Sequence, residues 1–147
     1  MKIAKLFLAA ATIAASALPA LAADLIHAGK WDYQIDMTMK GPRDFSNSMH
    51  QTQCIKPEDA KDPKKLMEEN NKRNNCKVTK WDMSGNKASY AMECSTPQGK
   101  MTSTGETTYA GDSYETHMKM DLSGGEAGKM SIEYHIKAKR LGDCDQK

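Results

Sequence analysis

The sequence lacks a second long apolar run, a block of like charges and a recognisable catalytic motif. Its one apolar stretch, residues 6–18, is too short for a comfortable membrane span. Charged residues are interleaved with uncharged ones, so no basic stripe is present and we do not expect nucleic acid as a partner. No serine stands in a Gly-x-Ser-x-Gly turn, and no carboxylate pair stands out as a general acid and base. We therefore expect a protein that is not an enzyme and uses no cofactor.

The N-terminus has the pattern of a secretory signal peptide. Two lysines precede the apolar stretch, and Ala20-Leu21-Ala22 follows it with the small-x-small pattern that signal peptidase accepts. We expect cleavage near Ala22, leaving residues 23–147 as a single domain. Removing the two leader lysines from the 21 basic residues leaves 19, equal to the 19 acidic residues. No cysteine follows the cut closely, so no lipid anchor is expected.

Closely spaced cysteine pairs are also absent. The gaps between the four cysteines are too long for a Cys-x-x-Cys zinc site, and their even number in an exported chain favours two disulfides. These cysteines are Cys54, Cys76, Cys94 and Cys144.

What the sequence does contain is a series of segments in which inward and outward residues alternate. A period of two predicts strands, here over residues 31–40, 45–54, 76–83, 87–94, 100–110, 113–122 and 130–138. The segments are separated by turn sequences such as Gly41-Pro42 and Gly111-Asp112. We predict an all-β fold, a seven-stranded antiparallel meander forming a partly or fully closed barrel. One short helix is predicted between strands two and three, capped by Asp62 and begun by Pro63, as a surface crossover.

The hairpin over residues 76–94 sets the expected register. Its Gly85-Asn86 loop places Trp81 opposite Tyr90 as an inward pair. A bulge at Thr79 or Lys80 restores the alternation.

That register also bears on the disulfides, because it places Cys76 opposite Cys94. If the first strand pairs with the last, Cys54 approaches Cys144. We favour these two pairs. The rival pairing joins Cys54 to Cys76 and Cys94 to Cys144.

Several short motifs resemble a known family, the domain of unknown function 3617, whose members are exported proteins of Gram-negative bacteria. The resemblance covers the whole chain after the leader and implies a periplasmic single-domain protein, but it implies no activity. It depends on Gly29-Lys30-Trp31, Cys54, Pro57-Glu58-Asp59-Ala60, Cys76, Ser84-Gly85-Asn86, Cys94, Gly105, Gly111-Asp112-Ser113-Tyr114 and Leu141-Gly142-Asp143-Cys144.

The predicted inner face is rich in methionine. Eight methionines fall on it, at positions 37, 39, 83, 92, 101, 118, 120 and 130. One interpretation is a filled core with methionine as adaptable filler, in a structural or partner-binding protein. The other is a wall around a small apolar ligand inside the barrel, in a binding or envelope-interaction module. The candidate ligand-binding residues are Tyr90, Met92, Ser103, Met118, Met120 and Tyr134.

The predicted outer face carries a second candidate site. The registers place Glu106 beside His117, and His117 beside His135, in one row across three strands. Two imidazoles and a carboxylate can bind Zn²⁺ or Cu²⁺. The alternative is that these histidines are simply solvated.

Overall fold

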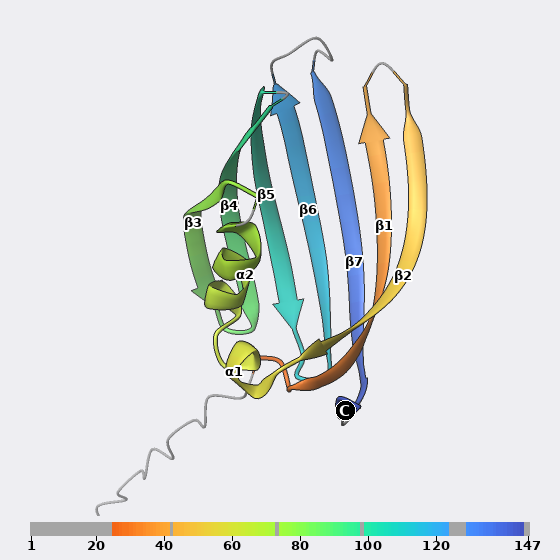
Figure 1. Cartoon of the computed structure of the whole chain (residues 1–147), viewed down its shortest axis with the longest axis vertical. Coiled ribbons are helices and arrows are strands. Elements are labelled where there is room, and N and C mark those ends of the chain that lie inside the picture. The colour runs from red at the N-terminus through yellow and green to blue at the C-terminus, as the bar shows by residue number, and fades with distance from the viewer. Residues whose placement is uncertain (1–24, 42, 73, 98, 124–128, 146–147) are drawn as a thin grey trace, which may run out of the picture.

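One antiparallel sheet of seven strands makes up most of the molecule, in the order β2-β1-β7-β6-β5-β4-β3 (Figure 1). The structure is a computed structural model that describes residues 25–41, 43–72, 74–97, 99–123 and 129–145. The predicted signal peptide, residues 1–22, and residues 124–128, which follow β6, lie outside the described residues. The strands are β1 (Gly29–Lys40), β2 (Phe45–Ile55), β3 (Cys76–Ser84), β4 (Lys87–Thr96), β5 (Gly99–Tyr109), β6 (Ser113–Ser123) and β7 (Met130–Gly142).

The strand pairings confirm the predicted meander. β1 pairs with β7 as well as with β2, so the first strand lies beside the last. In the β3–β4 hairpin Trp81 faces Tyr90, and the register shifts between Val78 and Lys80, where a bulge is predicted. Gly85 adopts the positive φ of 60° that the tight turn needs.

The predicted partly or fully closed barrel is not confirmed, because the sheet is open. Its two edges are β2 and β3, and no ladder joins them among the described residues. The strand that would have to close it, β2, is mostly polar, since only Phe45, Met49, Cys54 and Ile55 of its residues are apolar. It therefore has little apolar surface to bury against β3. The chain instead crosses from β2 to β3 through helices.

Two helices occupy this crossover where one is predicted, α1 (Pro57–Ala60) and α2 (Pro63–Lys72). The predicted start of α2 is confirmed, since Asp62 Oδ1 accepts a hydrogen bond from the Lys65 backbone N–H at 3.0 Å. α2 is more than a crossover, because it lies over one face of β3, β4 and β5 (Figure 1). We call this the inner face. In the described part of the chain, no helix has the length and apolar character to cross a membrane.

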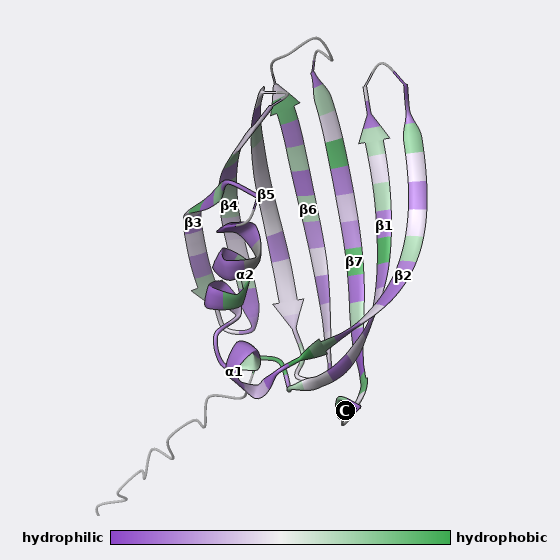
Figure 2. Ribbon diagram, viewed as in Figure 1, coloured by the Kyte–Doolittle hydropathy of each residue, from purple (hydrophilic) through white to green (hydrophobic). Residues whose placement is uncertain are grey.

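The best-packed part of the core lies where the N-terminal segment, the end of β2 and α1 meet the sheet. Trp31 is its centre, with 0% of the residue exposed. The Trp31 indole N–H donates to the His27 carbonyl at 3.0 Å. His27 in turn is hydrogen-bonded through its backbone N–H to the Gly111 carbonyl at 2.9 Å. Along β6 and β7, apolar and polar residues alternate, as period-two strands require (Figure 2).

Two cystine bridges cross-link the sheet, one within the β3–β4 hairpin and one between β2 and the C-terminal segment. Cys54 is joined to Cys144 and Cys76 to Cys94, with Cα atoms 5.6 Å and 4.0 Å apart. These are the two pairs favoured from the sequence, and neither rival pair is formed. The first bridge holds the end of β2 to the segment after β7.

Candidate binding sites on the two faces of the sheet

A hollow lies on the inner face beneath α2, divided into two adjoining pockets. Met67 and Asn71 of α2, together with Tyr90 of β4, line both pockets. We call the larger, of about 310 Å³, the methionine pocket, and the other, of about 260 Å³, the tyrosine pocket. The remaining walls of the methionine pocket are Asn74, Cys76, Met92, Cys94, Met101, Ser103, Met118 and Met120.

Five of the six predicted ligand-binding residues come together in the methionine pocket. Tyr90, Met92, Ser103, Met118 and Met120 all line it, and Ser103 stands directly between Met92 and Met120 in the strand register. The sixth, Tyr134 of β7, does not line this pocket. Tyr134 pairs with Met118 and contributes to a separate depression.

Ser103 supplies a fully buried and unsatisfied side-chain polar atom to the wall of the methionine pocket. Its residue is 2% exposed, and its Oγ has no hydrogen-bond partner among the described residues. A buried hydroxyl without a partner costs about 1–3 kcal/mol. Native proteins rarely accept that cost without a reason, and the flexible thioethers of Met92 and Met120 on either side are able to move aside.

The tyrosine pocket combines apolar walls with hydroxyl groups. Tyr33, Tyr109 and Tyr114 line it, and Thr107 and Thr116 hydrogen-bond to each other at 2.8 Å beneath them. Burial raises the pKa of Tyr109 to about 12 and that of Tyr114 well above its ordinary value. These side chains are therefore neutral, and their hydroxyl groups can donate hydrogen bonds to a bound molecule.

Tyr90 separates the two pockets and is held in place by two neighbours. Its ring stacks with the ring of Trp81, with centroids 6.3 Å apart and planes at 19°. Its far end covers Gly105, where a Cβ would lie 2.5 Å from the tyrosine Cζ. The predicted cross-strand pair is thus present, and the glycine makes room for the ring.

The contribution of α2 to the site is missed by the sequence reasoning, which treats the helix as a crossover. The only available signal was Leu66-Met67 on an otherwise polar helix. Leu66 lines the tyrosine pocket, and Met67 lines both pockets. Which face of the sheet such a helix covers is decided by the path of the chain.

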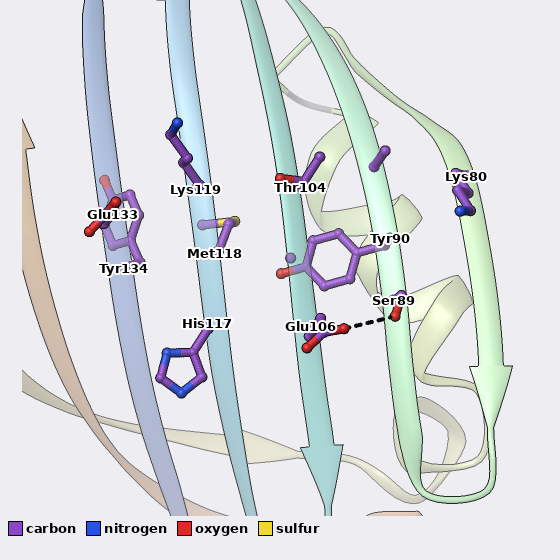
Figure 3. A pocket seen from close by; sticks show the side chains of 12 residues that line it. Lys80, Ser89, Tyr90, Thr104, Glu106, His117, Met118, Lys119, Glu133 and Tyr134 are labelled. Atoms are coloured by element: carbon purple, nitrogen blue, oxygen red, sulfur yellow. Dashed lines mark hydrogen bonds between the residues drawn. The ribbon is translucent and has the colours of Figure 1, made fainter.

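The opposite, outer face has an open depression of about 600 Å³ over Gly105, lined mainly by polar and charged side chains (Figure 3). Glu106 lies here, but its carboxylate is turned toward β4, where it is 3.5 Å from Ser89 Oγ and 3.9 Å from Lys87 Nζ. His117 lies on β6, and Glu106 makes no hydrogen bond or ion pair with it among the described contacts. The predicted row is confirmed as a register, but the structure brings a different carboxylate, that of Glu115, to the histidine pair.

Glu115 is the carboxylate that meets the histidines. Its Oε1 is hydrogen-bonded to His135 Nε2 and lies 3.7 Å from His117 Nε2. The two imidazole rings are stacked, with centroids 4.2 Å apart and planes at 14°. The hydrogen bond with His135 lowers the pKa of Glu115 below its ordinary value. Register reasoning missed Glu115 because it follows straight rows, whereas Glu115 reaches His135 along a diagonal.

Searches against curated proteins and against solved structures give no match to this chain. A family model described as "Protein of unknown function (DUF3617)" matches residues 26–144. That range includes all seven strands, both helices and all four cysteines. The chain therefore belongs to this family, as its glycine and cysteine motifs indicate.

Proposed function

We propose that the protein binds a small, uncharged, apolar or amphipathic molecule beneath α2 and does not transform it chemically. The observation that carries the proposal is the Ser103 hydroxyl, buried and unpartnered in the wall of the methionine pocket. A bound molecule with one hydrogen-bonding group would satisfy it, while the rest of that molecule would contact thioethers and aromatic rings.

The chemistry of the walls supports an uncharged ligand. Among the residues that the structure describes, no Asp, Glu, Lys, Arg or His lines the methionine pocket, and Asp59 is the single charged residue lining the tyrosine pocket. Burying an ion against such walls would be costly, because nothing there compensates its lost hydration. Methionine side chains adapt to irregular apolar shapes, which suits a surface that accepts more than one related molecule.

The size of the pockets supports a small ligand. The methionine pocket, of about 310 Å³, lies at the lower end of the range of about 300–1,000 Å³ typical of ligand sites, and the tyrosine pocket, of about 260 Å³, lies just below it. Because Tyr90 lies between them, a longer molecule would reach both pockets only if that ring moved.

We propose further that the protein works in the periplasm after export. The leader pattern of residues 1–22 and the two cystine bridges both suit an oxidising compartment. A module that carries or senses an apolar molecule in the envelope fits this location.

Substitution of Ser103 by leucine tests the proposal. Ser103→Leu should fill the methionine pocket and raise the free energy of unfolding through added apolar burial. It should also abolish the binding of an apolar fluorescent probe, for which an uncharged analogue of 1-anilinonaphthalene-8-sulfonate is suitable. Thr104→Leu is the matched control, because Thr104 is the exposed neighbour on the same strand. That control should leave probe binding unchanged.

Two results would argue against a ligand pocket. The first is destabilisation of Ser103→Leu by about 1–3 kcal/mol, which would indicate an already filled core. The second is the absence of probe binding by the parent protein, combined with native mass spectra of periplasmic material that carry no additional mass.

A second candidate function, partner binding, is favoured by the exposed edge strand β2. β2 has 11 residues and contains no Asp, Glu, Lys, Arg or Pro, the residues that usually protect an edge. Phe45 and Met49 on it are 49% and 42% exposed. A second copy of this chain could pair with β2 in an antiparallel, two-fold arrangement. Sedimentation should then show a dimer that Met49→Lys dissociates, whereas a monomer at high concentration would exclude it.

A further inference from the structure

We propose that Glu115, His117 and His135 form a binding site for a divalent transition metal ion, Zn²⁺ or Cu²⁺, on the outer face of the sheet. One ligand atom from each of these side chains lies within 4.8 Å of the other two. The site is separate from the pockets beneath α2, since none of its three residues lines either pocket.

The backbone places these side chains without help from a loop. Glu115 and His117 are two residues apart on β6, so both point to the same face of the sheet. His117 and His135 are directly opposed across the β6–β7 ladder. Opposed residues in such a ladder have Cβ atoms about 4.5–5.5 Å apart. The sheet therefore holds three ligands together before any ion arrives.

The three side chains are oriented so that their ligand atoms converge on one point, as the binding of a metal ion requires. The Nε2 atoms of both histidines approach the same oxygen, Glu115 Oε1. Zinc bonds to nitrogen and carboxylate oxygen are about 2.0–2.2 Å long, which places tetrahedral ligand atoms about 3.3 Å apart. From the present spacing of 3.7 Å between Glu115 Oε1 and His117 Nε2, small side-chain rotations reach that value. Two of the three residues are exposed and His135 is partly buried, so such rotations meet little resistance.

The donor set points to the class of metal. Two imidazole nitrogens and one carboxylate oxygen are the ligands of open zinc sites, in which water takes the fourth position. Imidazole also suits Cu²⁺, whereas Mg²⁺ and Ca²⁺ prefer oxygen ligands alone.

The charged residues that flank the histidine pair favour a bound cation, and one of them, Glu106, also provides a control variant. In the register, Glu106 stands on the far side of His117 and Asp36 on the far side of His135, so the histidine pair has a carboxylate at each end of its row. Neither carboxylate belongs to the cluster, because Glu106 is near Lys87 and Asp36 accepts a hydrogen bond from Ser48 at 2.5 Å. Lys137, opposite Glu115, is the nearest opposing cation in the register and limits the affinity.

Zinc titration of the purified chain, without a polyhistidine tag, tests the proposal. Isothermal calorimetry and competition with a chromogenic chelator should give one ion per chain. His117→Ala, His135→Ala and Glu115→Gln should each weaken binding by at least about tenfold. The EPR spectrum of the Cu²⁺ form should show nitrogen coupling from two imidazoles, and either histidine substitution should remove one of them.

Matched variants distinguish this site from general surface binding. Glu106→Gln, from the same row, and His50→Ala, an exposed histidine on β2, should bind zinc like the parent. Ser103→Leu should also leave zinc binding unchanged, which keeps this test independent of the proposed ligand pocket. The proposal is overturned if no zinc binds at micromolar concentrations, if the control variants weaken binding as much as the cluster variants, or if the cluster variants remain folded and bind normally.

Discussion

Gly105 and Tyr90 show how one missing side chain shapes the inner face. Glycine is a poor strand residue, yet Gly105 lies in the middle of β5. A Cβ there would come within 2.5 Å of both Cζ and Oη of Tyr90. The ring can lie flat over the backbone only because Gly105 has no side chain, and its position there divides the hollow beneath α2 into two pockets.

The two tryptophans differ in burial. The hairpin register predicts Trp81 as an inward residue, and the structure shows Trp81 only partly buried on the edge strand β3, while Trp31 is fully buried. Trp31→Ala should therefore cost about 3–5 kcal/mol of unfolding free energy. Trp81→Ala should cost less, roughly 1–3 kcal/mol, because part of its ring already contacts water. Urea melts of both variants measure the difference.

The comparison also tests where the core lies. If Trp81→Ala were the more destabilising of the two, the packing around the N-terminal segment would have to be looser than the structure shows. Trp31→Phe serves as an intermediate control, since it keeps most of the apolar volume but loses the hydrogen bond to the His27 carbonyl.

The buried tyrosines make stability depend on alkaline pH. Burial, and then the neighbouring Tyr109, raise the pKa of Tyr90 from 10.0 to about 12, and burial also raises that of Tyr109 to about 12. The unfolded chain ionises first, near pH 10, so the stabilisation is complete below pH 10 and is lost as the pH rises toward 12. The loss should approach about 1.4 kcal/mol per pH unit for each buried tyrosine.

Urea melts at pH 9 and pH 11, with tyrosinate absorbance at 295 nm recorded in parallel, check this dependence. Tyr90→Phe should flatten it by removing one of the ionising groups. If all the tyrosines of the folded protein ionised with a midpoint near pH 10, the buried positions of Tyr90 and Tyr109 would be wrong.

Among the secondary-structure elements, α2 is the one whose position in the structure differs most from the role predicted for it from the sequence. Its start is predictable because Asp62 and Pro63 are local signals for an N-cap and a first helical position. Its place over the inner face is not predictable from those residues, because it depends on where the end of β2 delivers the chain. Met67 and Asn71 become pocket walls only through that placement.

Removing the cap should loosen this helix selectively. Asp62→Ala deletes the acceptor for the Lys65 backbone N–H and should cost about 1 kcal/mol. Hydrogen exchange should become faster in α2 than in β4–β6, and dissociation of an apolar probe from the pocket should accelerate. Asp62→Asn, which retains a capping oxygen, is the control and should behave like the parent. Uniformly faster hydrogen exchange throughout the sheet would mean that α2 does not open independently of the strands.

For the whole molecule, the two cystine bridges should stabilise unequally. Cys54–Cys144 closes a sequence separation of 90 residues, and Cys76–Cys94 one of 18. Longer closed loops remove more entropy from the unfolded chain, so loss of the first bridge should cost about 4–5 kcal/mol and loss of the second about 3 kcal/mol. Denaturant melts of the two double Cys→Ala variants measure these costs.

Peptide mapping under non-reducing conditions checks the pairing itself. It should recover a peptide that joins Cys54 to Cys144 and another that joins Cys76 to Cys94. A peptide joining Cys54 to Cys76 would instead support the rival arrangement, in which the helices are enclosed by one bridge.

The sequence by itself determined the strands, their order and most of their registers. The reason is that period-two alternation, turn residues such as Gly85 and opposed pairs such as Lys119 and Glu133 act between neighbours in a meander. Only the tertiary structure decided the open edge between β2 and β3, the place of α2 and the approach of Glu115, rather than Glu106, to the histidine pair. These three depend on the path of the chain through space and on side-chain direction, which no pattern along the sequence records.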